Sequence, residues 1–134
     1  MTLVDTSAWV EYLRATGTAT HRQVHRLVQD EAPLHTTDTV VMEILAGAGD
    51  DAHVAQLRRL LSRCEFLPTH GLEDFEQAAS LYRQCRRGGE TVRALTDCLI
   101  AAVAVRSDIA VLHADRDFDT LARHTELQIF EDHR

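Results

Sequence analysis

Residues 2–13 read TLVDTSAWVEYL, which places a short apolar segment directly before an aspartate and an amphipathic stretch. The apolar segment predicts a short buried strand. The spacing of apolar side chains after it predicts a helix over residues 7–15, with Thr6 or Ser7 as its N-cap. Asp5 therefore ends a strand at a point where a plain turn residue would suffice. The role of Asp5 depends on whether the fold brings other carboxylates to the end of this strand.

The alternation of strand and helix continues along the chain. Short apolar runs bounded by turn residues predict strands, and longer runs with apolar side chains three or four apart predict helices. We expect strands at residues 2–5, 33–37, 64–69, 109–115 and 127–130, and helices at residues 7–15, 20–30, 38–49, 50–64, 72–87, 96–108 and 118–125. This order predicts an α/β fold, a mostly parallel sheet with helices on both faces. Neither a linker nor a repeat interrupts it, so we expect a single domain over residues 1–134.

Composition narrows the classes of function. The chain has a formal net charge of −7, and all 14 of its basic residues are arginine. Receiver domains and haloacid-dehalogenase-type phosphatases also cluster aspartates at strand ends, but they need a lysine that this chain lacks. An acidic chain is a poor general binder of nucleic acid, so binding would require local arginines and metal held by some of the acids. Three separated cysteines and no membrane-spanning apolar run or signal segment predict a reduced, cytoplasmic protein.

Four acids stand where a metal site could form. Asp5 and Asp115 end two predicted strands, and Glu43 and Asp97 lie within otherwise apolar helices. Each acid alone has an ordinary explanation as a helix cap, a turn residue or a solvated side chain. Together they would face one edge of a parallel sheet, and dehydrated carboxylates repel one another unless cations neutralise them. Oxygen ligands suit Mg²⁺, with Mn²⁺ as the alternative ion. His113, within a predicted strand, is expected to be a packed core residue.

The four motifs VDTSAWV, VVMEILAG, TDCLIAA and HADRDF resemble, in order and over the whole chain, the acidic motifs of PIN domains. More narrowly, they resemble VapC-type ribonuclease toxins of type II toxin–antitoxin pairs. The resemblance implies a five-stranded parallel sheet in the order 3-2-1-4-5. It also implies a set of site residues: the metal-binding catalytic acids Asp5, Glu43, Asp97 and Asp115, the additional acid Asp117, and a hydroxyl from Thr6 or Ser7.

The resemblance further implies an activity and its partners. The chain would be a Mg²⁺-dependent endoribonuclease that hydrolyses transfer or ribosomal RNA, forms a homodimer and is inhibited by a cognate VapB-type antitoxin in the cytoplasm. The Thr6 and Ser7 hydroxyls would contact RNA. Arginines near the motifs would do so too, namely Arg14, Arg86, Arg87, Arg93 and Arg116, with Arg93 and Arg116 nearest to the acids in sequence. The competing interpretation is a non-catalytic PIN-like module that binds RNA or protein. Metal-dependent cleavage of purified RNA would separate the two.

Overall fold

A parallel sheet of four strands, in the order β3-β2-β1-β4, forms the centre of the computed structural model, which describes residues 1–132. All four strands are short: β1 spans Thr2–Val4, β2 Leu34–Thr37, β3 Glu65–Leu67 and β4 Ala110–Leu112. Strand β1 lies between β2 and β4, and all three of its residues are buried. The predicted α/β class and the central strand pair are therefore confirmed.

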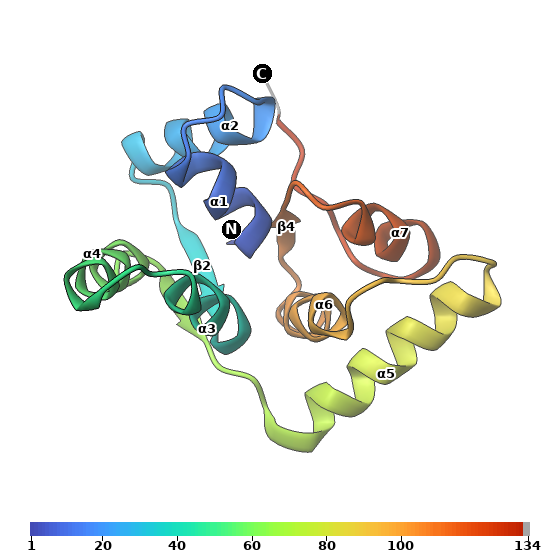
Figure 1. Cartoon of the computed structure of the whole chain (residues 1–134). Helices are drawn as coiled ribbons and strands as arrows, with labels where there is room; N and C mark the ends of the chain where they lie inside the picture. Colours follow the sequence, from blue (N-terminus) through green and yellow to red (C-terminus); the bar gives the residue numbers. More distant parts are fainter. Residues whose placement is uncertain (133–134) are drawn as a thin grey trace.

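Seven helices join and cover the strands: α1 (Thr6–Leu13), α2 (Ala19–Gln29), α3 (Asp38–Ala46), α4 (Asp51–Leu61), α5 (Gly71–Arg87), α6 (Leu95–Ser107) and α7 (Arg116–His124). The chain moves outward from β1 to β3 and then crosses back to β4. Because such crossovers are right-handed, the helices before and after β3 cover opposite faces of the sheet. Figure 1 shows the two groups, with α1 to α4 on one side of β4 and α5 to α7 on the other.

Helix α6 is the central helix of the domain. Its apolar side chains are buried nearly all round, as the sequence predicted, and it packs extensively against α5. A helix that is apolar on every side is stable only inside the protein. The charged residue in its first turn, Asp97, is therefore carried into the interior. No helix within residues 1–132 is both long and apolar enough to cross a membrane.

The predicted fifth strand at residues 127–130 is wrong as an independent strand. This segment does run beside β4, but it forms one isolated parallel bridge between Val111 and Ile129. Two backbone hydrogen bonds hold it, from Val111 N to Gln128 O and from Phe130 N to Val111 O. Strand β4 pairs with β1 at all three of its residues, whereas on its other edge Val111 alone forms a bridge within residues 1–132. The segment keeps the position of a fifth strand without its length.

A charged clamp fixes α7 to the loop between α5 and α6. The Glu90 carboxylate accepts hydrogen bonds from Arg123 at 2.9 and 2.7 Å and lies 2.8 Å from His124 Nε2. These bonds lower the pKa of Glu90 to about 2, with Arg123 as the largest cause. Gly88 allows the close approach, because a Cβ there would lie 2.2 Å from the His124 ring. The clamp matters for function because the same loop and helix carry several of the predicted site residues.

A second ion pair, in which the carboxylate is buried, joins α5 to α6. Arg106 donates two hydrogen bonds to the Asp74 carboxylate, at 3.1 and 3.0 Å, and a third to Pro68 O at 2.9 Å. Asp74 also accepts from His70 N at 2.8 Å. Burial would raise the pKa of Asp74, but the bonds from Arg106 and His70 hold it below its ordinary value. The pair fixes the chain where it turns from β3 into α5.

Candidate metal centre

Carboxylates from two helices and two strand ends meet at the carboxyl edge of the sheet. Asp97 in the first turn of α6 and Asp115 and Asp117 at the start of α7 offer ligand atoms that all lie within 4.8 Å of one another. Asp5 faces this group from the end of β1, and its charge contributes to raising the pKa of Asp97. The backbone explains the meeting, because Asp5 N donates to Leu112 O, the last residue of β4, at 2.9 Å.

Asp5 is held by its own helix and keeps one oxygen unused. Its Oδ2 caps α1 by accepting from Ser7 N at 2.9 Å and from Ser7 Oγ at 2.5 Å. Ser7 Oγ in turn accepts from Ala114 N at 2.9 Å, which ties the ends of β1 and β4 together. The second oxygen, Oδ1, is buried without a hydrogen-bond partner. Burial raises the pKa of Asp5, and the bonds from Ser7 oppose that rise.

Glu43 approaches from α3 on the other side of Asp5. Thr6 Oγ1 donates to Glu43 Oε1 at 2.8 Å, and the Glu43 charge is one cause of the raised pKa of Asp5. Thr6 and Ser7 thus each hold one acid of the site. Both hydroxyls were predicted to contact RNA, and the structure gives them carboxylate partners.

Asp97 is the most perturbed group of the site. Only 6% of the residue is exposed, and its Oδ2 is buried without a hydrogen-bond partner. Burial is the largest cause that raises its pKa to about 9, followed by a hydrogen bond to Asp117 and the charges of Asp5 and Asp115. At neutral pH and without a cation, Asp97 is therefore protonated and donates to Asp117. A divalent ion would reverse this preference, because its charge favours the carboxylate.

Asp117 caps α6 from a different helix. No side chain of the helix itself caps its N-terminus, and the Asp117 carboxylate accepts from Arg93 N at 3.1 Å and Ala94 N at 3.2 Å. Burial would raise the pKa of Asp117, but the bonds from Arg93, Asp97 and Ala94 hold it below the ordinary value. No local sequence signal indicates this role, because the capping acid lies 20 positions after Asp97.

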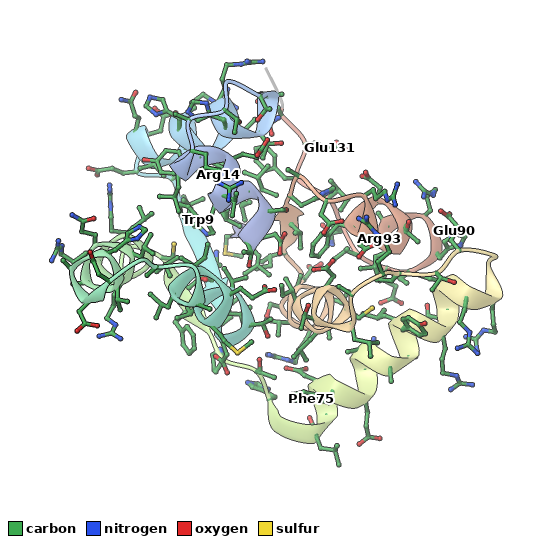
Figure 2. All side chains as sticks on the ribbon, viewed as in Figure 1. Trp9, Arg14, Phe75, Glu90, Arg93 and Glu131 are labelled. Carbon is green, nitrogen blue, oxygen red and sulfur yellow. The ribbon has the colours of Figure 1, made fainter. Side chains whose placement is uncertain are left out.

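The arginines that were predicted to contact RNA lie in three different parts of the structure. Arg93 lies inside the acid cluster, 3.0 Å from Asp115 and 3.3 Å from Asp117, and Figure 2 shows it beside α7. Arg116 lines a cavity of about 380 Å³ next to the acids, together with Arg93 and Arg123. Arg14 lines a different cavity of about 280 Å³ with Thr6 and Glu43, well apart from Arg93 (Figure 2). The remaining two arginines end α5, where Arg86 lies over the Tyr82 ring.

His113 has a role that the sequence did not indicate. It lies just after β4 and is largely buried, so its packing against Phe118 agrees with the predicted core position. Its Nδ1 also accepts from Asp115 N at 3.1 Å, while its Nε2 lies 3.5 Å from Asp119 Oδ1. His113 therefore orients the backbone that carries Asp115. In the sequence, this role could have been inferred from the position of His113, two residues before Asp115.

Comparison with known proteins gives consistent matches over nearly the whole chain. The profile of the PIN domain matches residues 2–124. A VapC ribonuclease of Mycobacterium bovis and Ribonuclease VapC11 of Mycobacterium tuberculosis are each 48% identical over 129 residues, which is 96% of both chains.

Solved structures share the fold at lower sequence identity. The structure of Rickettsia felis VapBC2 bound to promoter DNA aligns with a TM-score of 0.74 at 16% identity, covering 96% of each chain. Mycobacterium tuberculosis VapC20, described as a toxin that cleaves the sarcin–ricin loop, aligns with a TM-score of 0.67 at 26% identity, covering 96% of this chain and 99% of that one.

Proposed function

Because the chain belongs to the PIN domain family and, within it, to the VapC ribonucleases, we propose that it is a metal-dependent endoribonuclease toxin. The observation that carries the metal site is a pair of buried oxygens that have no hydrogen-bond partner within residues 1–132. They are Asp97 Oδ2, in the cluster with Asp115 and Asp117, and Asp5 Oδ1, whose carboxylate interacts electrostatically with Asp97. Buried polar atoms normally have partners, so two such oxygens at one sheet edge indicate a ligand that would satisfy them.

The donor set fits a hard divalent ion. Asp5, Glu43, Asp97 and Asp115 supply only oxygen, which favours Mg²⁺ or Mn²⁺ over softer metals. Asp117 already accepts two backbone N–H groups, so we assign it the positioning of α6 before any direct ligation. When bound, the ion would supply a Lewis acid that activates water and neutralises the leaving oxygen of an RNA phosphodiester.

The side chains around the acids would orient this chemistry. Ser7 fixes one oxygen of Asp5 and leaves the other without a partner in the described part of the chain, and Thr6 donates to one oxygen of Glu43. His113 fixes the backbone of Asp115. Such preorganisation is needed because small displacements of reacting groups cost large factors in rate.

The two cavities beside the acids suggest the path of the RNA. Arg14 lines one of them, and Arg93 and Arg116 line the other, so guanidinium groups would contact backbone phosphates on both sides of the scissile bond. The described relative VapC20 cleaves the sarcin–ricin loop. We propose a structured ribosomal or transfer RNA as the substrate here, because RNA loops are recognised by shape and by their exposed bases.

We also propose a cognate VapB-type antitoxin as the inhibitor, and the cytoplasm as the place of action. Several similar structures are toxin–antitoxin complexes, among them VapBC2 of Rickettsia felis and VapBC of Salmonella typhimurium. An antitoxin segment that bears arginine could pair with the acid cluster, and it would then compete with metal and with RNA.

A homodimer is proposed from exposed apolar side chains on two consecutive elements. Phe66 on β3 and Leu72 and Phe75 on α5 are each more than half exposed, which is unusual for large apolar residues on a monomer. We expect the protein to be a dimer by light scattering at micromolar concentration and Phe75→Glu to shift it toward monomer. A parent protein that is monomeric under these conditions would contradict the proposal.

The decisive test of the activity is cleavage of purified RNA with and without metal. We expect cleavage in Mg²⁺, none in EDTA, and recovery when Mn²⁺ replaces Mg²⁺, with the cut positions mapped by sequencing the RNA ends. The matched control is the same assay with Asp108→Asn, which removes one acid at the far end of α6. RNA binding without cleavage under all of these conditions would favour the non-catalytic alternative.

A further inference from the structure

We propose that Arg93 is an exchangeable cation of the metal centre. It neutralises Asp115 and Asp117 before a divalent ion binds, and it is released on metal binding to contact an RNA phosphate in the cavity that it already lines. The inference rests on the proposed metal-dependent ribonuclease activity. It adds a coupling between metal binding and RNA binding that the acids alone would not produce.

The contacts of Arg93 place its charge directly among the proposed ligands. Its terminal nitrogen lies 3.0 Å from Asp115 Oδ1, and its Nε lies 3.3 Å from Asp117 Oδ1. These two aspartates belong to the three-acid cluster. A guanidinium at this distance repels an incoming cation and occupies an oxygen that faces the cluster. Metal and the Arg93 side chain therefore compete for the same carboxylates.

The acids can release Arg93 without leaving a buried polar atom unpaired. Asp117 keeps its bonds from Arg93 N and Ala94 N, which belong to the backbone and do not depend on the guanidinium. Asp115 Oδ1 keeps its bond from Asp117 N at 2.9 Å. The side chain itself is 55% exposed, so it can move without disturbing the core. Arg106 differs because its own side chain is only 31% exposed and also donates to Pro68 O.

The cavity beside Arg93 is lined by three arginines and three acids, so it gains a surplus of positive charge only when metal neutralises Asp117. Its lining includes Arg93, Arg116 and Arg123 with Glu90, Asp117 and Asp119. Arg123 is neutralised by Glu90, and Asp119 lies beside His113. Within residues 1–132 the Arg116 guanidinium has neither an ion pair nor a hydrogen bond. If metal neutralises Asp115 and Asp117, Arg93 and Arg116 remain to bind a phosphate, the anion that guanidinium groups pair with best.

Arg93 and metal compete for the same carboxylates, and the released Arg93 side chain can bind an RNA phosphate. Metal binding and RNA binding therefore strengthen each other. Metal binding frees the arginine for RNA, and RNA that holds the arginine vacates the carboxylates for metal. Linkage requires the two effects to be equal in size. The arrangement would keep the enzyme weakly loaded with metal until its substrate is present.

The test is a titration of the purified protein with Mn²⁺ in the absence of RNA. Electron paramagnetic resonance measures the free ion at each step and so gives the Mn²⁺ affinity. We expect Arg93→Gln to bind Mn²⁺ about tenfold more tightly than the parent, the scale on which one partly solvated charge acts on a neighbouring ion. Arg116→Gln is the matched control, because it removes the same charge from the same cavity without touching the acids. Its Mn²⁺ affinity should stay within about a factor of two of the parent, since screening weakens exposed charges that make no direct contact.

A second measurement uses a phosphorothioate RNA oligonucleotide that resists cleavage. Added Mn²⁺ should strengthen RNA binding by the parent and by Arg116→Gln, and it should do so much less for Arg93→Gln. Weaker Mn²⁺ binding by Arg93→Gln would show that Arg93 only positions the acids, and it would overturn the exchange. If the parent binds Mn²⁺ and Asp97→Asn binds it equally well, the proposed metal site fails and the exchange fails with it.

Discussion

Replacement of Asp97 by asparagine is expected to lower RNA cleavage about a thousandfold or more, the usual scale for loss of a group central to catalysis. The same change should leave the metal-free protein at least as stable as the parent. Burial raises the pKa of Asp97, and Asp117, Asp5 and Asp115 raise it further, so the protonated form is favoured without metal. Asparagine has the shape of the protonated acid, and its amide can still donate to Asp117.

The stability of the metal-free protein should depend on pH through the same residue. The folded pKa of Asp97, about 9, lies above the value of roughly 3.9 for an unfolded aspartate. The folded state therefore binds the proton more tightly, and this contribution to stability is complete below the unfolded pKa. It is lost progressively as the pH rises toward 9. Asp97→Asn should remove this loss, so the variant should exceed the parent in stability most clearly at high pH.

Thermal melts at pH 6 and pH 9, with EDTA or Mg²⁺, measure both effects. The parent should gain stability from Mg²⁺, because ligand binding to the folded state stabilises it, and the variant should gain much less. Asp108→Asn is the control of equal charge, and residue 108 has a positive φ that asparagine tolerates. A variant that melts far below the parent in EDTA would identify Asp97 as a structural residue. Parental cleavage by the variant would refute the metal site.

Arg106→Met is expected to destabilise the domain by about 3–5 kcal/mol, the cost of leaving one member of a buried ion pair without its partner. Asp74 is only 3% exposed, and without Arg106 its carboxylate keeps the hydrogen bond from His70 N. Methionine retains much of the apolar stem, so the loss reflects charge more than packing. Pro68 O loses its donor as well.

Replacing both partners should recover much of the loss. In Asp74→Asn with Arg106→Met no buried charge remains, and removal of both groups costs less than removal of one. Urea unfolding of the parent, both single variants and the double variant gives the coupling energy directly. In the parent, the stabilisation from Asp74 should disappear as the pH falls below about 4, because its folded pKa lies below the unfolded value. Purely additive losses in the double variant would show that the pair does not act as a unit.

The sequence by itself determined the order of strands and helices and the acids at their ends. Periods of two and of three to four residues are local properties, so they located β1, β4 and α6 to within a few residues. Asp5 and Asp115 were identified as site residues because each ends a predicted strand. Asp97 was identified because it is an acid within an apolar helix. These inferences needed no knowledge of which segments touch.

Only the tertiary structure decided how those segments meet. The expected fifth strand forms one bridge to β4, and the Asp117 carboxylate at the start of α7 caps α6. Arg93 reaches Asp115 across 22 positions of sequence, and Ser7 reaches Ala114 across 107. Such pairings depend on where the folded chain brings distant segments together. The residue types and spacings therefore specified which groups could react, and packing specified which partners hold them.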